Sequence, residues 1–164
     1  MDLFLILTYF YPVVQRTKKM TRIFIGEGIV FLYIVLLVYA AVTKLLDHEK
    51  FVVQVGQSPI LTDYAVFLAW AVPLVELVIS ALLIVPGTRL VGLYAGFSLL
   101  VMFTTYIVLA SRFSDFVPCS CGGVLEGMTW TQHLFFNVAF VLMGIIGILL
   151  YPKLRTMYST PDHV

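Results

Sequence analysis

Long apolar runs with few polar interruptions dominate the chain. Four of them cover residues 23–46, 64–85, 90–111 and 133–151, and each approaches or exceeds the roughly 20 residues that a membrane-spanning helix needs. Apolar and polar positions do not alternate as they would in the strands of a membrane barrel. The pattern therefore predicts an all-α, polytopic membrane protein, folded as a bundle of four transmembrane helices.

The composition agrees with this prediction and excludes other classes of protein. Hydrophobic residues make up 61% of the 164 residues, and charged residues make up 12%. A soluble domain has about 45–50% hydrophobic and about 25% charged residues. Ten Lys and Arg against nine Asp and Glu give no basic excess for binding nucleic acid. Two cysteines are too few for a disulfide scaffold.

Proline and glycine predict where two of the spans end. Pro86 and Gly87 follow the second run, and Pro152 follows the fourth, where a regular helix is not expected to continue. The apolar residues 3–11 are too few to cross a bilayer, so we expect an interfacial segment there. The chain then has an N-terminal interfacial segment and basic cytoplasmic stretch (1–22), a four-helix membrane domain (23–152) and a cytoplasmic tail (153–164).

The basic residues predict the orientation, because cytoplasmic loops carry an excess of Lys and Arg. An N-in, C-in arrangement puts seven of the ten basic residues in the cytoplasm: Arg16, Lys18, Lys19, Arg22, Arg89, Lys153 and Arg155. Only Lys44, Lys50 and Arg112 would lie outside. In a bacterial inner membrane the loops at residues 47–63 and 113–132 would then face the periplasm.

Both cysteines lie in the second of these loops, in the sequence Pro118-Cys119-Ser120-Cys121-Gly122-Gly123. The Cα atoms at the ends of an extended tripeptide are about 6–7 Å apart, at the edge of the range that a disulfide accepts. A disulfide between the two cysteines would be strained and labile, as expected of a catalytic pair. It would close almost no loop, so it would add little as a structural cross-link. Cys119 and Cys121 are therefore candidates for a redox-active pair.

Two other interpretations of the cysteines remain open. They are inert small residues, or they bind a metal ion together with His133. Structural zinc usually has four ligands and a wider spacing between cysteines. The redox interpretation is therefore favoured, and no metal is expected.

A few polar residues in or beside the spans are candidates for supporting roles. Glu76 lies near the middle of the second run, where a carboxylate is a functional candidate by default. Lys44, Arg112 and His133 flank the outer loops, and a cation near a thiol favours the reactive thiolate. The alternatives are that Lys44 and His133 are interfacial residues, and that Glu76 makes a structural hydrogen bond to another span. The candidate partners for that bond are Thr104, Thr105, Tyr106 and Asn137.

These features also occur in a characteristic order. Lys44-Leu45-Leu46-Asp47 and Phe51 close the first run, Pro73-Leu74-Val75-Glu76-Leu77 lies in the second, the cysteine motif precedes the fourth, and Trp130 and Asn137 lie at its start. Over about residues 27–150 the chain resembles the MauE branch of the DoxX-like family of four-helix bacterial membrane proteins. The resemblance implies a thiol redox function on the periplasmic side, which supports the maturation of partner proteins. It also implies a link to quinones, with which relatives of this branch function. It implies that Cys119 and Cys121 are the redox pair and that Lys44 and Glu76 are polar residues of the bundle.

The hypothesis that follows is a membrane thiol–disulfide redox protein, whose cysteines exchange electrons with a periplasmic or membrane protein partner. Because the chain has a single cysteine pair, the electrons would pass on to a quinone bound between the helices, or to another protein. The alternative is a non-catalytic membrane subunit or assembly factor of an envelope complex. Both hypotheses involve the lipid bilayer, and neither involves nucleic acid.

Overall fold

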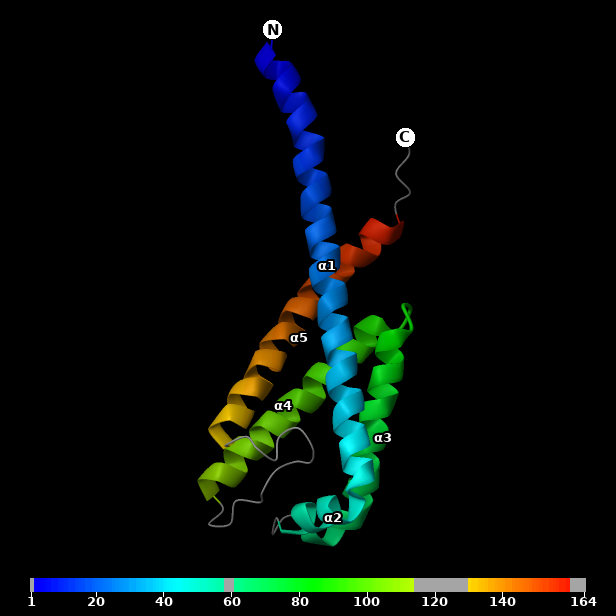
Figure 1. The fold of residues 1–164 in the computed structure, drawn as a ribbon, viewed down its shortest axis with the longest axis vertical. Coiled ribbons are helices and arrows are strands. Elements are labelled where there is room, and N and C mark those ends of the chain that lie inside the picture. Colours follow the sequence, from blue (N-terminus) through cyan, green and yellow to red (C-terminus); the bar gives the residue numbers. More distant parts are fainter. Residues whose placement is uncertain (1, 58–60, 114–129, 160–164) are drawn as a thin grey trace.

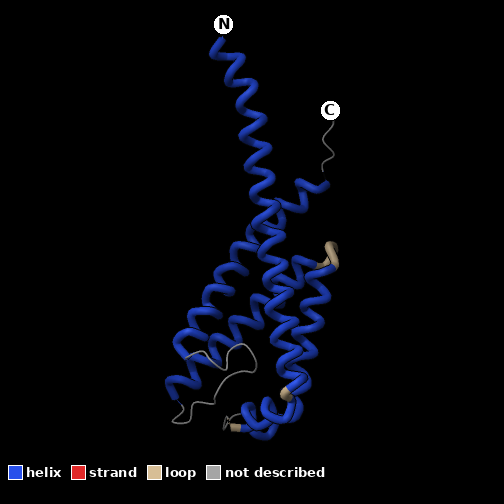
Figure 2. Tube along the Cα trace, viewed as in Figure 1, coloured by secondary structure: helices blue, strands red, loops and turns tan. Residues whose placement is uncertain are grey.

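The computed structural model describes the backbone of residues 2–57, 61–113 and 130–159 and the side chains of residues 20–57, 61–109 and 131–151. Within these ranges the structure consists of helices joined by short turns, and it contains no strand (Figure 2). The elements are α1 (Asp2–Leu46), α2 (His48–Gly56), the short 3-10 helix η1 (Thr62–Tyr64), α3 (Ala65–Ile84), α4 (Arg89–Phe113) and α5 (Trp130–Ser159).

Four segments of these helices are long and apolar enough to cross a membrane: Met20–Leu46, Thr62–Ile84, Arg89–Leu109 and Thr131–Tyr151. They correspond to the four predicted spans, so the predicted all-α, four-span fold is confirmed. Their outward faces carry large apolar side chains, with Phe24, Phe67 and Phe135 more than two-thirds exposed. A surface of this kind suits the hydrocarbon core of a bilayer and not water.

The four long helices pack in the order α1, α3, α4, α5, and α5 returns to contact α1. The first residues of α1 and the last residues of α5 lie at the same end of the bundle (Figure 1). At the opposite end, α2 packs on α3, and the end of α4 lies near the start of α5. The predicted cytoplasmic location of the termini remains a prediction.

The link between α3 and α4 forms as the sequence predicts. Val85 has an extended backbone, with φ −80° and ψ 118°, as expected of a residue that precedes a proline. The Thr88 hydroxyl donates to the Leu82 carbonyl (2.9 Å), and Arg89 Nε donates to the Leu83 carbonyl (3.2 Å). These bonds satisfy carbonyl groups that the end of α3 would otherwise leave without partners.

Two helices extend further than expected. The prediction that Pro152 ends the fourth helix is wrong, because α5 continues to Ser159. A proline removes one backbone N–H, and a helix can continue past it. Residues 2–22 are not a separate element, because they continue the first span as one helix of 45 residues. The expected position of residues 3–11 at the membrane surface remains a prediction.

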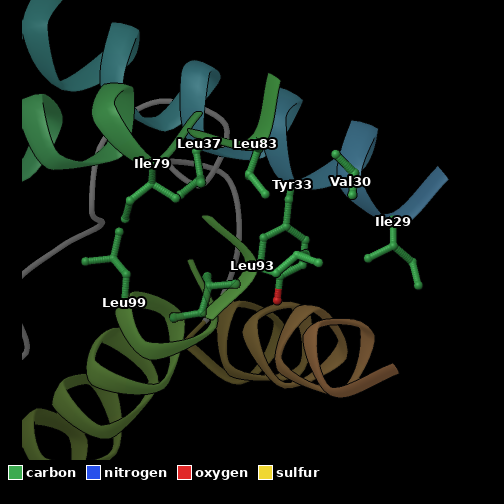
Figure 3. Close-up of a cluster of buried hydrophobic side chains, with 9 residues drawn as sticks. Ile29, Val30, Tyr33, Leu37, Ile79, Leu83, Leu93 and Leu99 are labelled. Carbon is green, nitrogen blue, oxygen red and sulfur yellow. The ribbon is translucent and has the colours of Figure 1, made fainter. Parts of the chain in front are cut away.

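The core is centred on Tyr33, which is fully buried (Figure 3). Its side chain points from α1 toward α5, where its hydroxyl donates to the Phe140 carbonyl at 2.7 Å. Leu83 of α3 and Leu93 of α4 belong to the same buried cluster. Tyr33 therefore links the first and last spans through a hydrogen bond inside an otherwise apolar core.

Glycines let the helices approach Tyr33 closely. A Cβ on Gly96 would lie 3.1 Å from the Tyr33 ring, and a Cβ on Gly144 would collide with the Tyr33 hydroxyl and lie 3.2 Å from Phe97. Because Tyr33 is held by its hydrogen bond and fully buried, it has little room to move away. The same arrangement of small residues at helix contacts is common among membrane helices.

We expect Gly144→Ala to lower stability by about 1–3 kcal/mol, the usual range for an overpacked core. The check is the midpoint of unfolding in detergent micelles titrated with a denaturing detergent. Gly28→Ala is the matched control, because a Cβ at that position has nothing within 4 Å. Adding Tyr33→Phe should recover part of the loss by removing the colliding oxygen. Equal midpoints for the Gly144 and Gly28 variants would contradict this account of the core.

Candidate functional site: a polar cavity at the α2 end of the bundle

A buried ion pair joins the first two spans. Lys44 Nζ of α1 lies 2.7 Å from Glu76 Oε1 of α3, and the two residues are only 4% and 1% exposed. Lys44 Nζ also donates to the Ala40 carbonyl at 3.3 Å. Charges removed from water in this way are stable only when they are paired and hydrogen-bonded.

The helix α2 explains why Lys44 points inward instead of toward the membrane surface. After the turn at Asp47, α2 folds back on α3, and His48 stacks on Trp70 with ring centroids 4.5 Å apart. Phe51 of α2 is buried, and its ring centroid lies 5.8 Å from Lys44 Nζ. Phe103 of α4 lies at 5.7 Å. Both rings are within the range of a cation–π interaction.

A cavity of about 110 Å³ lies beside this ion pair. Its walls are mostly apolar and aromatic, and Phe51, Phe103 and Phe136 are among them. A few polar residues reach into it from three of the spans: Lys44, Glu76, His133 and Asn137. An apolar pocket with a small set of convergent polar groups is the usual form of a small-molecule site.

The polar residues of the cavity are buried, and one of their atoms has no hydrogen-bond partner among the described residues. His133 and Asn137 lie one turn apart on α5, and both are buried. Glu76 Oε2 has no hydrogen-bond partner among the described residues. Buried polar atoms of this kind usually have a partner, so a ligand or a water molecule that donates to Oε2 would complete the site.

The structure brings together most of the residues that the sequence singles out. Lys44, Glu76, His133 and Asn137 come from α1, α3 and α5 and surround one cavity. Arg112 lies in the last turn of α4, and its side chain is outside the described residues. Cys119 and Cys121 also lie outside the described residues.

The alternative partners considered for Glu76 are corrected. The bonded partner of Glu76 is Lys44, not a polar residue of the third or fourth span, because α2 buries the lysine against α3. The hydroxyls of Thr104 and Thr105 instead donate to carbonyls of their own helix. A second ion pair links Glu27 of α1 to Arg89 of α4 at 2.8 Å.

The sequence did not predict two components of the site. The nine-residue helix α2 was expected as part of a loop, although it supplies Phe51 as a wall of the cavity. Phe103 and Phe136, which also line the cavity, were not singled out among the apolar residues of their spans. Their helical spacing alone does not show which apolar residues face a cavity.

These observations define the class: a four-span helical membrane protein with an internal ion pair and a cavity near one end of the bundle. Residues 22–150 match the model of a protein family described as Methylamine utilisation protein MauE. The chain therefore belongs to the MauE family. The match covers the four candidate spans except for residues 20 and 21 of the first span and residue 151 of the last. No curated protein and no solved structure matched the chain.

Proposed function

We propose that this protein is a membrane thiol–disulfide redox protein, in which Cys119 and Cys121 exchange electrons with a protein partner. A thiolate of one partner attacks a sulfur of the disulfide in the other and forms a mixed disulfide. The second thiolate of the dithiol then attacks the sulfur that the first contributed to the mixed disulfide, which forms a disulfide within the former dithiol and releases the other protein's sulfur as a thiolate. The dithiol loses two electrons and two protons, and the disulfide gains them.

The observation that carries this proposal is the mostly apolar cavity, with four buried polar residues, at the end of the bundle where α4 ends and α5 begins. Cys119 and Cys121 lie in the segment that connects Phe113 to Trp130. His133, in the first turn of α5, is one of the cavity residues. A redox pair in this segment is joined through the chain to α4 and α5, and both of these helices line the cavity.

Family membership directs the proposal toward a biological setting. The name of the family connects it with methylamine utilisation, so we propose that the partner is a protein of this process that needs a disulfide formed or rearranged. The proposed location is the bacterial inner membrane, with both termini in the cytoplasm and the cysteine loop in the periplasm. In that compartment thiols are readily oxidised.

Thiol trapping tests both the redox state and the side of the membrane. Intact spheroplasts are treated with a membrane-impermeant maleimide of high mass, before and after mild reduction, and the mass shift of the protein is read on a gel. We expect no shift before reduction and two additions after it. Thiols that remain unreactive after reduction, or that react only when the cytoplasmic side is opened, would overturn the proposal.

A non-catalytic assembly subunit is the competing function, and the same assay separates the two. A scaffold does not require its cysteines to change state. If both thiols stay free in oxidised membranes and the partner still assembles, the scaffold is the better account.

A further inference from the structure

The order of the helices divides the bundle into two pairs. α1 packs most extensively on α3, and α4 packs most extensively on α5. Within each pair the chain connects the helices at the α2 end of the bundle, through α2 in the first pair and between Phe113 and Trp130 in the second. The first pair is joined to the second only through the turn at residues 85–88, which lies at the opposite end (Figure 1). The chain is therefore connected as two helical hairpins that share one turn.

Near this turn, the contact between the two pairs is tight. A Cβ added at any of four glycines of the second pair would come within 3.1 Å of a side chain of the first. These glycines are Gly92 and Gly96 on α4 and Gly144 and Gly147 on α5, and the side chains that they face are those of Ile29, Tyr33 and Leu83. The hydrogen bond from Tyr33 to the Phe140 carbonyl also joins the two pairs here. Small residues let helix backbones approach closely, so the pairs are held together at this level.

Toward the α2 end, the cavity separates the two pairs. Figure 1 shows α4 and α5 diverging from α1 and α3 in this direction, and residues of both pairs line the cavity of about 110 Å³. Across it, Lys44 of the first pair meets Phe103 of the second through a cation–π contact. Such a contact is weaker than the charge-assisted hydrogen bond from Lys44 to Glu76 within the first pair. Side chains that line a void lack neighbours on one side, so separating them loses little dispersion energy.

A surrounding bilayer makes separation of the pairs less unfavourable than it would be in water. Water penalises newly exposed apolar surface, whereas lipid tails are as apolar as the side chains that they replace. Tyr39 of α1 lines the cavity and is 43% exposed on the outer surface of the bundle, so the cavity extends to the lipid-facing surface. Lys44 and Glu76 both belong to the first pair, so these buried charges stay together when the second pair moves.

We infer that α4 and α5 move as one unit against α1, α2 and α3, pivoting on the glycine contact with Tyr33 and separating at the α2 end, so that the cavity opens to the bilayer. A few turn residues are enough to absorb a hinge motion of this kind. The turn at residues 85–88 includes Gly87, where a Cβ would meet nothing within 4 Å.

The use of this movement in thiol exchange rests on the proposed function. Cys119 and Cys121 lie between α4 and α5, so both ends of their segment belong to the moving pair. The movement itself requires only the described helices. It can therefore be tested in a protein that has neither cysteine.

Distances between nitroxide labels test the movement, in the Cys119→Ser, Cys121→Ser protein placed in lipid nanodiscs. The labels are attached to cysteines introduced at exposed apolar positions, where they disturb the core little. Val42→Cys on α1 with Phe135→Cys on α5 reports the distance between the pairs at the α2 end. Double electron–electron resonance gives the distribution of this distance, and we expect it to be broad or to have two components.

Two further label pairs are the controls. Val42→Cys with Phe67→Cys lies within the first pair, at the same end of the bundle. Phe24→Cys with Leu149→Cys joins the two pairs on the other side of the glycine contact. Both should give a single narrow distribution. If the distribution for residues 42 and 135 is as narrow as those of the controls, the inference is overturned.

A variant that weakens the contact across the cavity should favour the open form. Phe103→Leu removes the ring that faces Lys44, and we expect the fraction of longer distances between residues 42 and 135 to rise about two- to fivefold, as for the loss of a cation–π contact. The matched control is Phe97→Leu on the same helix, because the Phe97 ring lies beside Gly144 within the second pair. It should leave the distribution unchanged. Circular dichroism and elution as a single species check the folding of both, and an unchanged distribution in a folded Phe103→Leu variant would contradict the inference.

The distance measurement and the thiol-trapping test have separate outcomes. A narrow distribution at the α2 end overturns the movement and leaves thiol exchange by Cys119 and Cys121 standing. Thiols that fail the trapping test overturn the proposed function and leave the movement standing, because the labelled protein contains neither of these cysteines.

Discussion

Replacing both Cys119 and Cys121 by serine is expected to reduce thiol exchange to the background rate while the protein still inserts and folds. A serine hydroxyl cannot form the mixed disulfide through which exchange proceeds. The four spans and their packed core lie elsewhere in the chain, so the fold should not depend on the sulfurs. The measurement is the rate at which the purified protein oxidises a reduced dithiol peptide, with a quinone supplied as the electron acceptor.

The single variants sharpen this prediction. If one cysteine attacks the partner and the other resolves the mixed disulfide, removal of the resolving cysteine should trap a partner covalently. Cys119→Ser and Cys121→Ser are therefore expected to differ, and one of them should give a band on a non-reducing gel that disappears with reductant. Ser120→Ala, between the two, is the matched control and should exchange normally. Full exchange activity in the double variant would contradict the redox proposal.

The spans could be predicted because a membrane-spanning helix depends on a continuous stretch of the sequence and not on contacts between distant residues. About 20 consecutive apolar residues can be counted along the sequence without knowledge of the fold. Pro86 and Gly87 likewise predict a turn from the local sequence alone, whatever the packing of the neighbouring helices. The turn does lie there, with Val85 already extended. Pro152 gave a wrong expectation, because a proline removes one backbone N–H but does not always end a helix, and α5 continues to Ser159.

The sequence predicted which polar residues belong to the site, but not how they are arranged. Lys44 and Glu76 are conspicuous because polar residues are rare in spans, but their pairing depends on how α1, α2 and α3 pack in space. Lys44, near the end of a span, looked like an interfacial anchor since nothing in the sequence shows that α2 covers it. The aromatic walls were not predictable, because an apolar residue facing lipid and one facing a cavity have the same sequence pattern.

The buried ion pair between Lys44 and Glu76 is expected to have a large effect on the free energy of unfolding when either partner is replaced alone. Glu76→Leu alone leaves the Lys44 ammonium buried without its counterion, and Lys44→Met alone leaves the carboxylate. Each should lower the free energy of unfolding by about 3–5 kcal/mol, whereas the double variant Lys44→Met, Glu76→Leu should be nearly neutral, because an apolar pair of similar volume removes both desolvation penalties. The measurement is the unfolding midpoint in detergent for all four proteins.

The second ion pair of the bundle supplies the control for this cycle. Glu27 and Arg89 lie 2.8 Å apart, but their side chains are 40% and 21% exposed, so removing either should lower stability by only about 0–1 kcal/mol. If the single variants at Lys44 and Glu76 were no worse than those at Glu27 and Arg89, the buried pair would not hold α1 to α3.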